Sequence, residues 1–142
     1  MVKKLIIAGL IVVVIASGFG LWLYNKPHRA IKNEKAFLST TAASLASEFA
    51  DNDSVSHRKY FEKVIEVSGR VTKVSDVDSL IMITIDPGES FLVSCFLDKE
   101  EKLRPLVDDS VLIKGLYVGY LPVDADFGLP GDIKFRNCFV LN

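Results

Sequence analysis

The first part of the chain is an uninterrupted apolar segment. Residues 5–24 read LIIAGLIVVVIASGFGLWLY and contain no charged side chain. A helix of this length, at about 1.5 Å of rise per residue, is about 30 Å long and matches the hydrocarbon core of a bilayer. Trp22 and Tyr24 lie at its far end, and such amphipathic rings favour the headgroup region. We therefore predict that residues 1–24 form an N-terminal transmembrane helix.

A signal peptide is the alternative interpretation of the same segment. Ala16, Ser17 and Gly18 are small residues of the kind that signal cleavage requires. The apolar run nevertheless continues to Tyr24, and it exceeds the roughly 7–15 apolar residues of a typical signal peptide. These two features favour a retained signal anchor.

The charges that flank the apolar segment give conflicting indications of membrane orientation. Lys3 and Lys4 precede it, as in an uncleaved signal anchor whose following domain is exported. Strict charge counting would instead place the domain in the cytoplasm, because four basic residues follow the segment: Lys26, Arg29, Lys32 and Lys35. We predict a single-pass membrane protein whose domain is periplasmic or otherwise extracytoplasmic.

Beyond the anchor, the polar residues 25–32 contain Pro27 and are predicted to form a linker, so that one domain occupies residues 33–142. This domain opens with an apolar stripe at helical spacing: Leu38, Ala42, Leu45 and Phe49. Asn33 is the predicted N-cap of this helix, and the polar residues 51–53 end the pattern. A second, short helical segment is predicted over residues 54–61.

After residue 63 the apolar positions alternate with a period of two, which indicates strands. Turn-forming residues at 75–79 and 86–89 separate the first three strands, and residues 98–104 have the composition of a short helix. The predicted strands cover residues 64–74, 80–85, 91–97, 110–120 and 133–141. We therefore predict an α+β, mainly β fold. After the transmembrane helix come a helix and a five-stranded OB-like Greek-key barrel, with a short helix between strands three and four.

Four short strings resemble the tRNA-anticodon-like OB-fold family. They are KYFEKVIEVSGRV at 59–71, VSCF at 93–96, VLIKG at 111–115 and NCFV at 137–140. Members of this family are small bacterial chains with an N-terminal apolar segment, and the resemblance covers residues 33–142. It implies the barrel without implying tRNA binding, because the family's name records a similarity of fold. Phe61 and Glu62 stand where a Gly is more usual in that pattern, and this departure concerns only a local turn.

Cys95 and Cys138 are the only cysteines, and in an OB barrel the third and fifth strands, which carry them, lie side by side. A disulfide requires Cα atoms about 5.5 Å apart and would stabilise the fold by about 4 kcal/mol on the entropic model. The alternative is a pair of buried free thiols that pack as small apolar side chains. Both interpretations stay open, and export of the domain would favour the disulfide.

No pattern in the sequence predicts a metal site, a cofactor or an enzymatic centre. His28 and His57 lack the paired spacing of zinc ligands. The loop that contains Asp124, Asp126 and Asp132 does not match a calcium-binding EF-hand. Neither a nucleophile elbow nor a phosphate-binding Gly loop is present. We therefore expect a non-enzymatic protein without a cofactor. An enzyme that uses Asp124 and Asp126 as acid and base is a third class.

Nucleic-acid binding is the first function that an OB fold suggests, but the charges argue against it. Of the 17 basic residues, Lys3 and Lys4 precede residue 25, which leaves 15 against 18 acidic ones. The two ligand loops of an OB fold, at 75–79 and 121–132, contain no Lys or Arg but five aspartates: Asp76, Asp78, Asp124, Asp126 and Asp132. Aromatic residues without nearby cations are more typical of a core or a protein contact than of base stacking. This applies to Tyr117, Tyr120 and Phe127.

The sequence therefore predicts a membrane-tethered OB-fold binding module of the bacterial envelope, with a protein, peptide or glycan as its ligand. The candidate ligand-loop residues are Asp76, Asp78, Tyr117, Tyr120, Asp124, Asp126 and Phe127. The alternative is a cytoplasm-facing OB domain that binds single-stranded nucleic acid.

Overall fold

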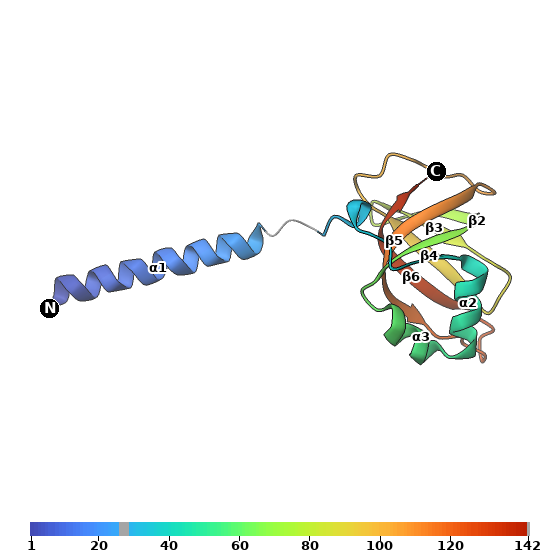
Figure 1. Cartoon of the computed structure of the whole chain (residues 1–142), viewed down its shortest axis with the longest axis horizontal. Helices are drawn as coiled ribbons and strands as arrows, with labels where there is room; N and C mark the ends of the chain where they lie inside the picture. The colour runs from blue at the N-terminus through green and yellow to red at the C-terminus, as the bar shows by residue number, and fades with distance from the viewer. Residues whose placement is uncertain (26–28, 142) are drawn as a thin grey trace. The chain divides into compact units, whose positions relative to one another are not determined.

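The computed structural model describes residues 1–25 and 29–141. The chain divides into two compact units, Met1–Ala30 and Ile31–Asn142, which are drawn in Figure 1. Residues 26–28 of the predicted linker lie outside the described residues. Ile31, which was assigned to that linker, is buried in the second unit.

The first unit contains helix α1 (Val2–Tyr24), which confirms that the apolar segment is helical. None of its residues is buried in the protein. By length and composition α1 can cross a membrane, and a membrane anchor and a signal sequence both meet that description.

The first helix of the domain, α2 (Ala42–Asp51), begins later than predicted. The predicted N-cap, Asn33, belongs instead to the short 3₁₀-helix η1 (Ile31–Asn33), and Leu38 lies in strand β1 (Leu38–Thr41). α2 begins at Ala42 because the Thr41 side chain accepts a hydrogen bond from the backbone N–H of Ser44. The apolar stripe is confirmed from Ala42 onwards. Leu38 was placed in the wrong element because a single apolar residue fits either pattern.

A second helix, α3 (Asp53–Tyr60), follows α2 after one residue and confirms the second predicted helical segment. That residue, Asn52, ends α2 and caps α3, since its side chain accepts a hydrogen bond from the backbone N–H of Val55. The Tyr60 hydroxyl donates to Oε2 of Glu48 at 2.6 Å and ties α3 back to α2. The two helices form a fixed corner at the end of the domain opposite to the C-terminus (Figure 1).

The strands form one mixed sheet in the order β1-β2-β3-β4-β6-β5, and β2 also pairs with β5. The pairings therefore link β2, β3, β4, β6 and β5 in a ring. The bounds of these five strands lie close to the predicted ones: β2 (Val64–Val77), β3 (Leu80–Ile85), β4 (Phe91–Leu97), β5 (Ser110–Leu121) and β6 (Gly131–Val140). The β1–β2 and β4–β6 pairs are parallel, and the other pairs are antiparallel.

Strand β1 is a sixth strand that the sequence did not predict. It pairs with the first half of β2, whereas β3 pairs with the second half, so β2 is long enough to hold both neighbours. The sequence of β1 is LSTT, in which Leu38 is the only large apolar residue. Such a short segment has no period-two pattern to recognise.

The predicted turn at residues 75–79 is a two-residue hairpin turn. β2 continues to Val77, and only Asp78 and Ser79 precede β3. Both have positive φ, 49° and 68°, as the type I′ turn of a tight hairpin requires. Asp76 therefore lies in a strand and Asp78 at a tip, and there is no wide loop here.

The predicted helix over residues 98–104 does not form, and residues 98–109 are a loop with turns between β4 and β5. Carboxylates bind its backbone N–H groups. Oδ1 of Asp98 accepts from Glu100, and Oε1 of Glu101 accepts from Leu103, each at 2.9 Å. Such local bonds favour turns over a helix, and Pro105 cannot continue a helix.

The strand register defines two ends of the domain. At one end Phe91, the first residue of β4, pairs with Gly131, the first residue of β6. We call this the helix end, because the α2–α3 corner lies there beside Phe91. At the other end Leu97 pairs with Cys138, close to the end of β6. We call this the C-terminal end. One apolar core runs between the two ends.

Candidate binding site

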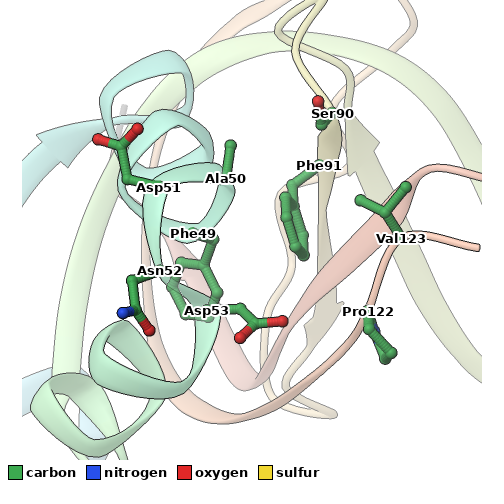
Figure 2. A pocket seen from close by; sticks show the side chains of 9 residues that line it. All are labelled: Phe49, Ala50, Asp51, Asn52, Asp53, Ser90, Phe91, Pro122 and Val123. Carbon is green, nitrogen blue, oxygen red and sulfur yellow. The ribbon is translucent and has the colours of Figure 1, made fainter.

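A recess of about 420 Å³ lies at the helix end of the domain. Three segments form it: the α2–α3 corner, the start of β4, and the beginning of the loop between β5 and β6 (Figure 2). The lining residues are Phe49, Ala50, Asp51, Asn52, Asp53, Ser90, Phe91, Pro122 and Val123. Side chains from distant parts of the sequence therefore meet at one surface.

Two aromatic rings form an apolar floor for this recess. Phe49 and Phe91 are almost fully buried, and their ring centroids lie 5.8 Å apart. The ring of Tyr120 packs 5.5 Å from that of Phe49. The Phe91 ring lies against Gly131, where any Cβ would overlap it. The floor is therefore fixed by close packing on strands β4, β5 and β6.

The rim of the recess is acidic. The Asp53 carboxylate points across the recess toward Pro122, whereas that of Asp51 points away from Phe91 (Figure 2). None of the nine lining residues is Lys or Arg, and the sequence segments that contain or adjoin them, residues 49–53, 86–90 and 121–131, also have no Lys or Arg. Their six carboxylates belong to Asp51, Asp53, Asp86, Glu89, Asp124 and Asp126. Carboxylates of one sign around a concave surface attract cationic groups.

The loop between β5 and β6 is ordered by one of its own carboxylates. Asp124 and Leu129 exchange two backbone hydrogen bonds, and Oδ1 of Asp124 accepts from the N–H groups of Asp126 and Phe127. Phe127 is 79% exposed on this loop. Apolar contact surface thus lies on the same loop that contributes Pro122 and Val123 to the recess.

The structure brings four of the predicted ligand-loop residues to the helix end. Asp124, Asp126 and Phe127 lie in the β5–β6 loop, and Tyr120 lies half-buried beside Phe49. The recess itself depends on residues that sequence reasoning did not select. Phe49 was assigned only to a helix stripe, and residues 51–53 only to a helix end. No sequence pattern indicates that they face β4 and the β5–β6 loop.

Tyr117, one of the candidate ligand-loop residues, is a core residue in the structure. It has no exposed surface, and its hydroxyl lies 2.9 Å from Nδ1 of His57. Burial raises the pKa of the Tyr117 hydroxyl, and the nearby Tyr120 and Asp53 raise it further. The interaction fixes α3 against β5.

Asp76 and Asp78 are separated from the other predicted ligand residues. Met82 pairs with Phe96 near the end of β4, and the hairpin tip that follows Val77 lies beyond this pair. The recess adjoins the opposite end of β4, at Phe91. The two predicted ligand loops therefore do not form one surface.

Cys95 and Cys138 are free, buried thiols in the structure. Cys95 pairs with Phe135, and Cys138 pairs with Leu97, so the two cysteines are diagonal neighbours on β4 and β6. Burial raises the pKa of the Cys138 thiol, and a hydrogen bond with Cys95 adds to this effect. The disulfide stays a prediction. Across residues 1–25 and 29–141, His, Cys, Asp and Glu side chains form no group suited to a metal ion.

A family model described as tRNA_anti-like matches residues 1–124. Among solved structures, OBody AM3L09 bound to hen egg-white lysozyme is 17% identical with a TM-score of 0.39, and the match covers 59% of this chain and 86% of that chain. The crystal structure of yeast Stn1 and Ten1 gives 19% identity and a TM-score of 0.35 over 82% of this chain and 68% of that chain. No curated protein matches the sequence.

Proposed function

Because the chain belongs to the tRNA_anti-like family, we propose that residues 31–142 form an OB-type binding module, held to a membrane by α1 and without enzymatic activity. The ring of β2, β3, β4, β6 and β5 is then the five-stranded barrel of that fold, and β1 is an addition to it. A fold does not specify a ligand, so the ligand has to be argued from the site.

The ligand that fits the recess best is a protein or peptide segment of the envelope that places a Lys or Arg beside an apolar side chain. The observation that carries this proposal is that the exposed apolar residues Pro122 and Val123 and the carboxylates of Asp51 and Asp53 line one recess. The alkyl part of a basic side chain can pack on the exposed Pro122 and Val123 while its charge meets Asp53. Phosphate groups of a nucleic acid would be repelled at the same place.

A panel of fluorescent peptides tests this ligand class on the full chain in detergent micelles. Peptides with alternating Lys and Leu should bind, and binding should weaken as salt rises. The same peptides with Glu in place of Lys should not bind. An uncharged glycan ligand would bind without salt dependence, and an oligonucleotide that bound at low salt would favour the nucleic-acid alternative.

Matched variants locate the site. Asp51→Asn with Asp53→Asn should raise the Kd of the basic peptide by about three- to tenfold, the range expected for one or two partly screened charge pairs. Asp76→Asn with Asp78→Asn removes the same charge from the distant hairpin and should leave the Kd unchanged. Equal effects of the two double variants would contradict the site.

The proposed location of the domain is the extracytoplasmic side of the membrane. It is supported by the unburied apolar helix α1 and by Lys3 and Lys4 at its start. External protease added to intact spheroplasts should then digest residues 31–142. Protection of the domain until the spheroplasts are lysed would contradict an extracytoplasmic location.

A further inference from the structure

The loop between β4 and β5 exposes three large apolar side chains within five residues. Leu103, Leu106 and Val107 are 50%, 69% and 52% exposed. Apolar side chains that gather on an exposed surface mark an interaction site, whereas singly scattered ones need no explanation. The recess at the helix end does not use them.

Hydrogen bonds hold this loop in place. The buried Glu101 carboxylate accepts from the backbone N–H groups of Leu103 and Val140, both at 2.9 Å. Oδ2 of Asp109 accepts from Leu106 at 2.8 Å, and the backbone of residues 108–109 exchanges two hydrogen bonds with Val71. The outward position of the apolar side chains is therefore part of the fold.

The chain enters the domain close to this loop. η1 packs on β5 and β6, where Ile31 clusters with Phe139. Burial disfavours the charged form of Glu101, but backbone hydrogen bonds and the charge of Lys32 outweigh it and lower the pKa of the carboxyl group. Glu101 also binds the backbone N–H of Val140, the residue after Phe139, so η1 lies near the base of the loop. Only residues 25–30 separate α1 from η1, and the seven steps from Tyr24 to Ile31 reach at most about 25 Å at roughly 3.6 Å per residue.

We propose that Leu103, Leu106 and Val107 insert into the surface of the lipid bilayer in which α1 is anchored, so that the C-terminal end of the domain rests on the membrane. This inference depends on the proposed membrane tether and is independent of the peptide ligand. The short tether keeps the loop near the bilayer, and a membrane interface accepts apolar side chains flanked by long basic ones. The exposed Lys99, Lys102 and Arg104 supply those flanks.

Acidic residues in the same loop limit the electrostatic contribution. Glu100, Asp108 and Asp109 are exposed beside the three basic residues. The contact should therefore depend mainly on apolar insertion and only weakly on anionic lipid. The recess then faces away from the membrane, because it lies at the helix end.

Tryptophan fluorescence of the full chain in phosphatidylcholine vesicles tests the contact. Trp22 is the only Trp, so Trp22→Phe provides a background without signal. Leu106→Trp in that background should show blue-shifted emission and strong quenching by lipids brominated in their acyl chains. Phe127→Trp, on the helix end, is the matched control and should emit as in water with little quenching. Adding Val107→Asp to the Leu106→Trp variant should weaken its quenching while the circular dichroism spectrum stays the same.

Flotation of the same vesicles separates the two proposals. A chain that floats with the vesicles but shows equal quenching at positions 106 and 127 overturns the lipid contact and leaves the proposed tether in place. A chain that does not float overturns both. Quenching that Val107→Asp leaves unchanged also overturns the contact.

Discussion

Gly115 lies where strand β5 is pressed against a cysteine of β6. A Cβ at this position would come within 2.6 Å of Sγ of Cys138 and 3.4 Å of Cβ of Phe135. Both neighbours are buried in the core, so neither has space into which to move. Packing therefore requires a glycine here.

The Gly115→Ala variant should lower the free energy of unfolding by about 1–3 kcal/mol, as overpacking of a core does. Urea unfolding followed by circular dichroism measures the loss. When Gly115→Ala is combined with Cys138→Ala the sulfur is absent, and the double variant should then be almost as stable as Cys138→Ala alone. A single Gly115→Ala variant as stable as the unmodified chain would contradict the predicted overlap.

Glu101 should make stability depend on pH. Its pKa in the folded protein is lowered, so its contribution is present above the unfolded pKa of about 4.3 and is lost as pH falls through the folded pKa. Glu101→Gln should lower the free energy of unfolding near pH 7 by about 1–3 kcal/mol, because a neutral amide cannot accept both backbone N–H groups equally well. Urea unfolding between pH 7 and pH 3 should show a shallower acid loss in the variant. Parallel pH profiles for the two proteins would show that Glu101 has no such role.

At the scale of elements, the sequence predicts the strands and helices that contain a long patterned run of apolar residues. It misses the elements whose presence or limits depend on single side chains. Strands β2 to β6 are runs of six or more residues rich in apolar side chains, and their predicted bounds lie close to the observed ones. The helix over residues 98–104 was wrong because Asp98 and Glu101 bind the backbone N–H groups that a helix would use. The start of α2 was predicted too early because Thr41, and not Asn33, caps the helix. Both residue types are common N-caps, so the sequence alone does not distinguish them.

Asn52 is the single residue between α2 and α3, and it both ends α2 and caps α3. Asn52→Ala should lower the free energy of unfolding by about 1 kcal/mol, the usual cost of a lost N-cap. Asn52→Asp keeps a cap acceptor and adds favourable charge at the start of α3, so it should retain most of the stability. Thermal unfolding compares the three proteins. Equal losses in both variants would mean that the cap does not stabilise the corner.

At the scale of the whole molecule, the domain does not depend on α1 for its core. No residue of α1 is buried, whereas Ile31 already packs into the domain. Residues 31–142 expressed alone should therefore fold, and the midpoint of thermal unfolding should match that of the domain in the full chain. A fragment that lacks a cooperative transition would contradict the division at Ile31.

The candidate site was only partly accessible from the sequence, because it is a product of the strand register. The acidic character of the β5–β6 loop and the exposure of Phe127 follow from local composition. The recess exists because the parallel pairing of β4 with β6 brings Phe91 beside Gly131, and because the corner at Asn52 turns toward them. The same register places Asp78 at the C-terminal end of the domain, although in the sequence Asp78 and Asp126 both lie in acidic turn segments.

The ring of strand pairings has a consequence for crowding. A strand with a vacant row of N–H and C=O groups is a template on which another copy can add. Here each of the strands β2 to β6 has a hydrogen-bonded neighbour on both sides along part of its length. Only the four-residue β1 has a neighbour on one side alone, so the described strands leave little edge on which another copy could add. If the chain is tethered to a bilayer as proposed, its domains should therefore stay separate at high surface density.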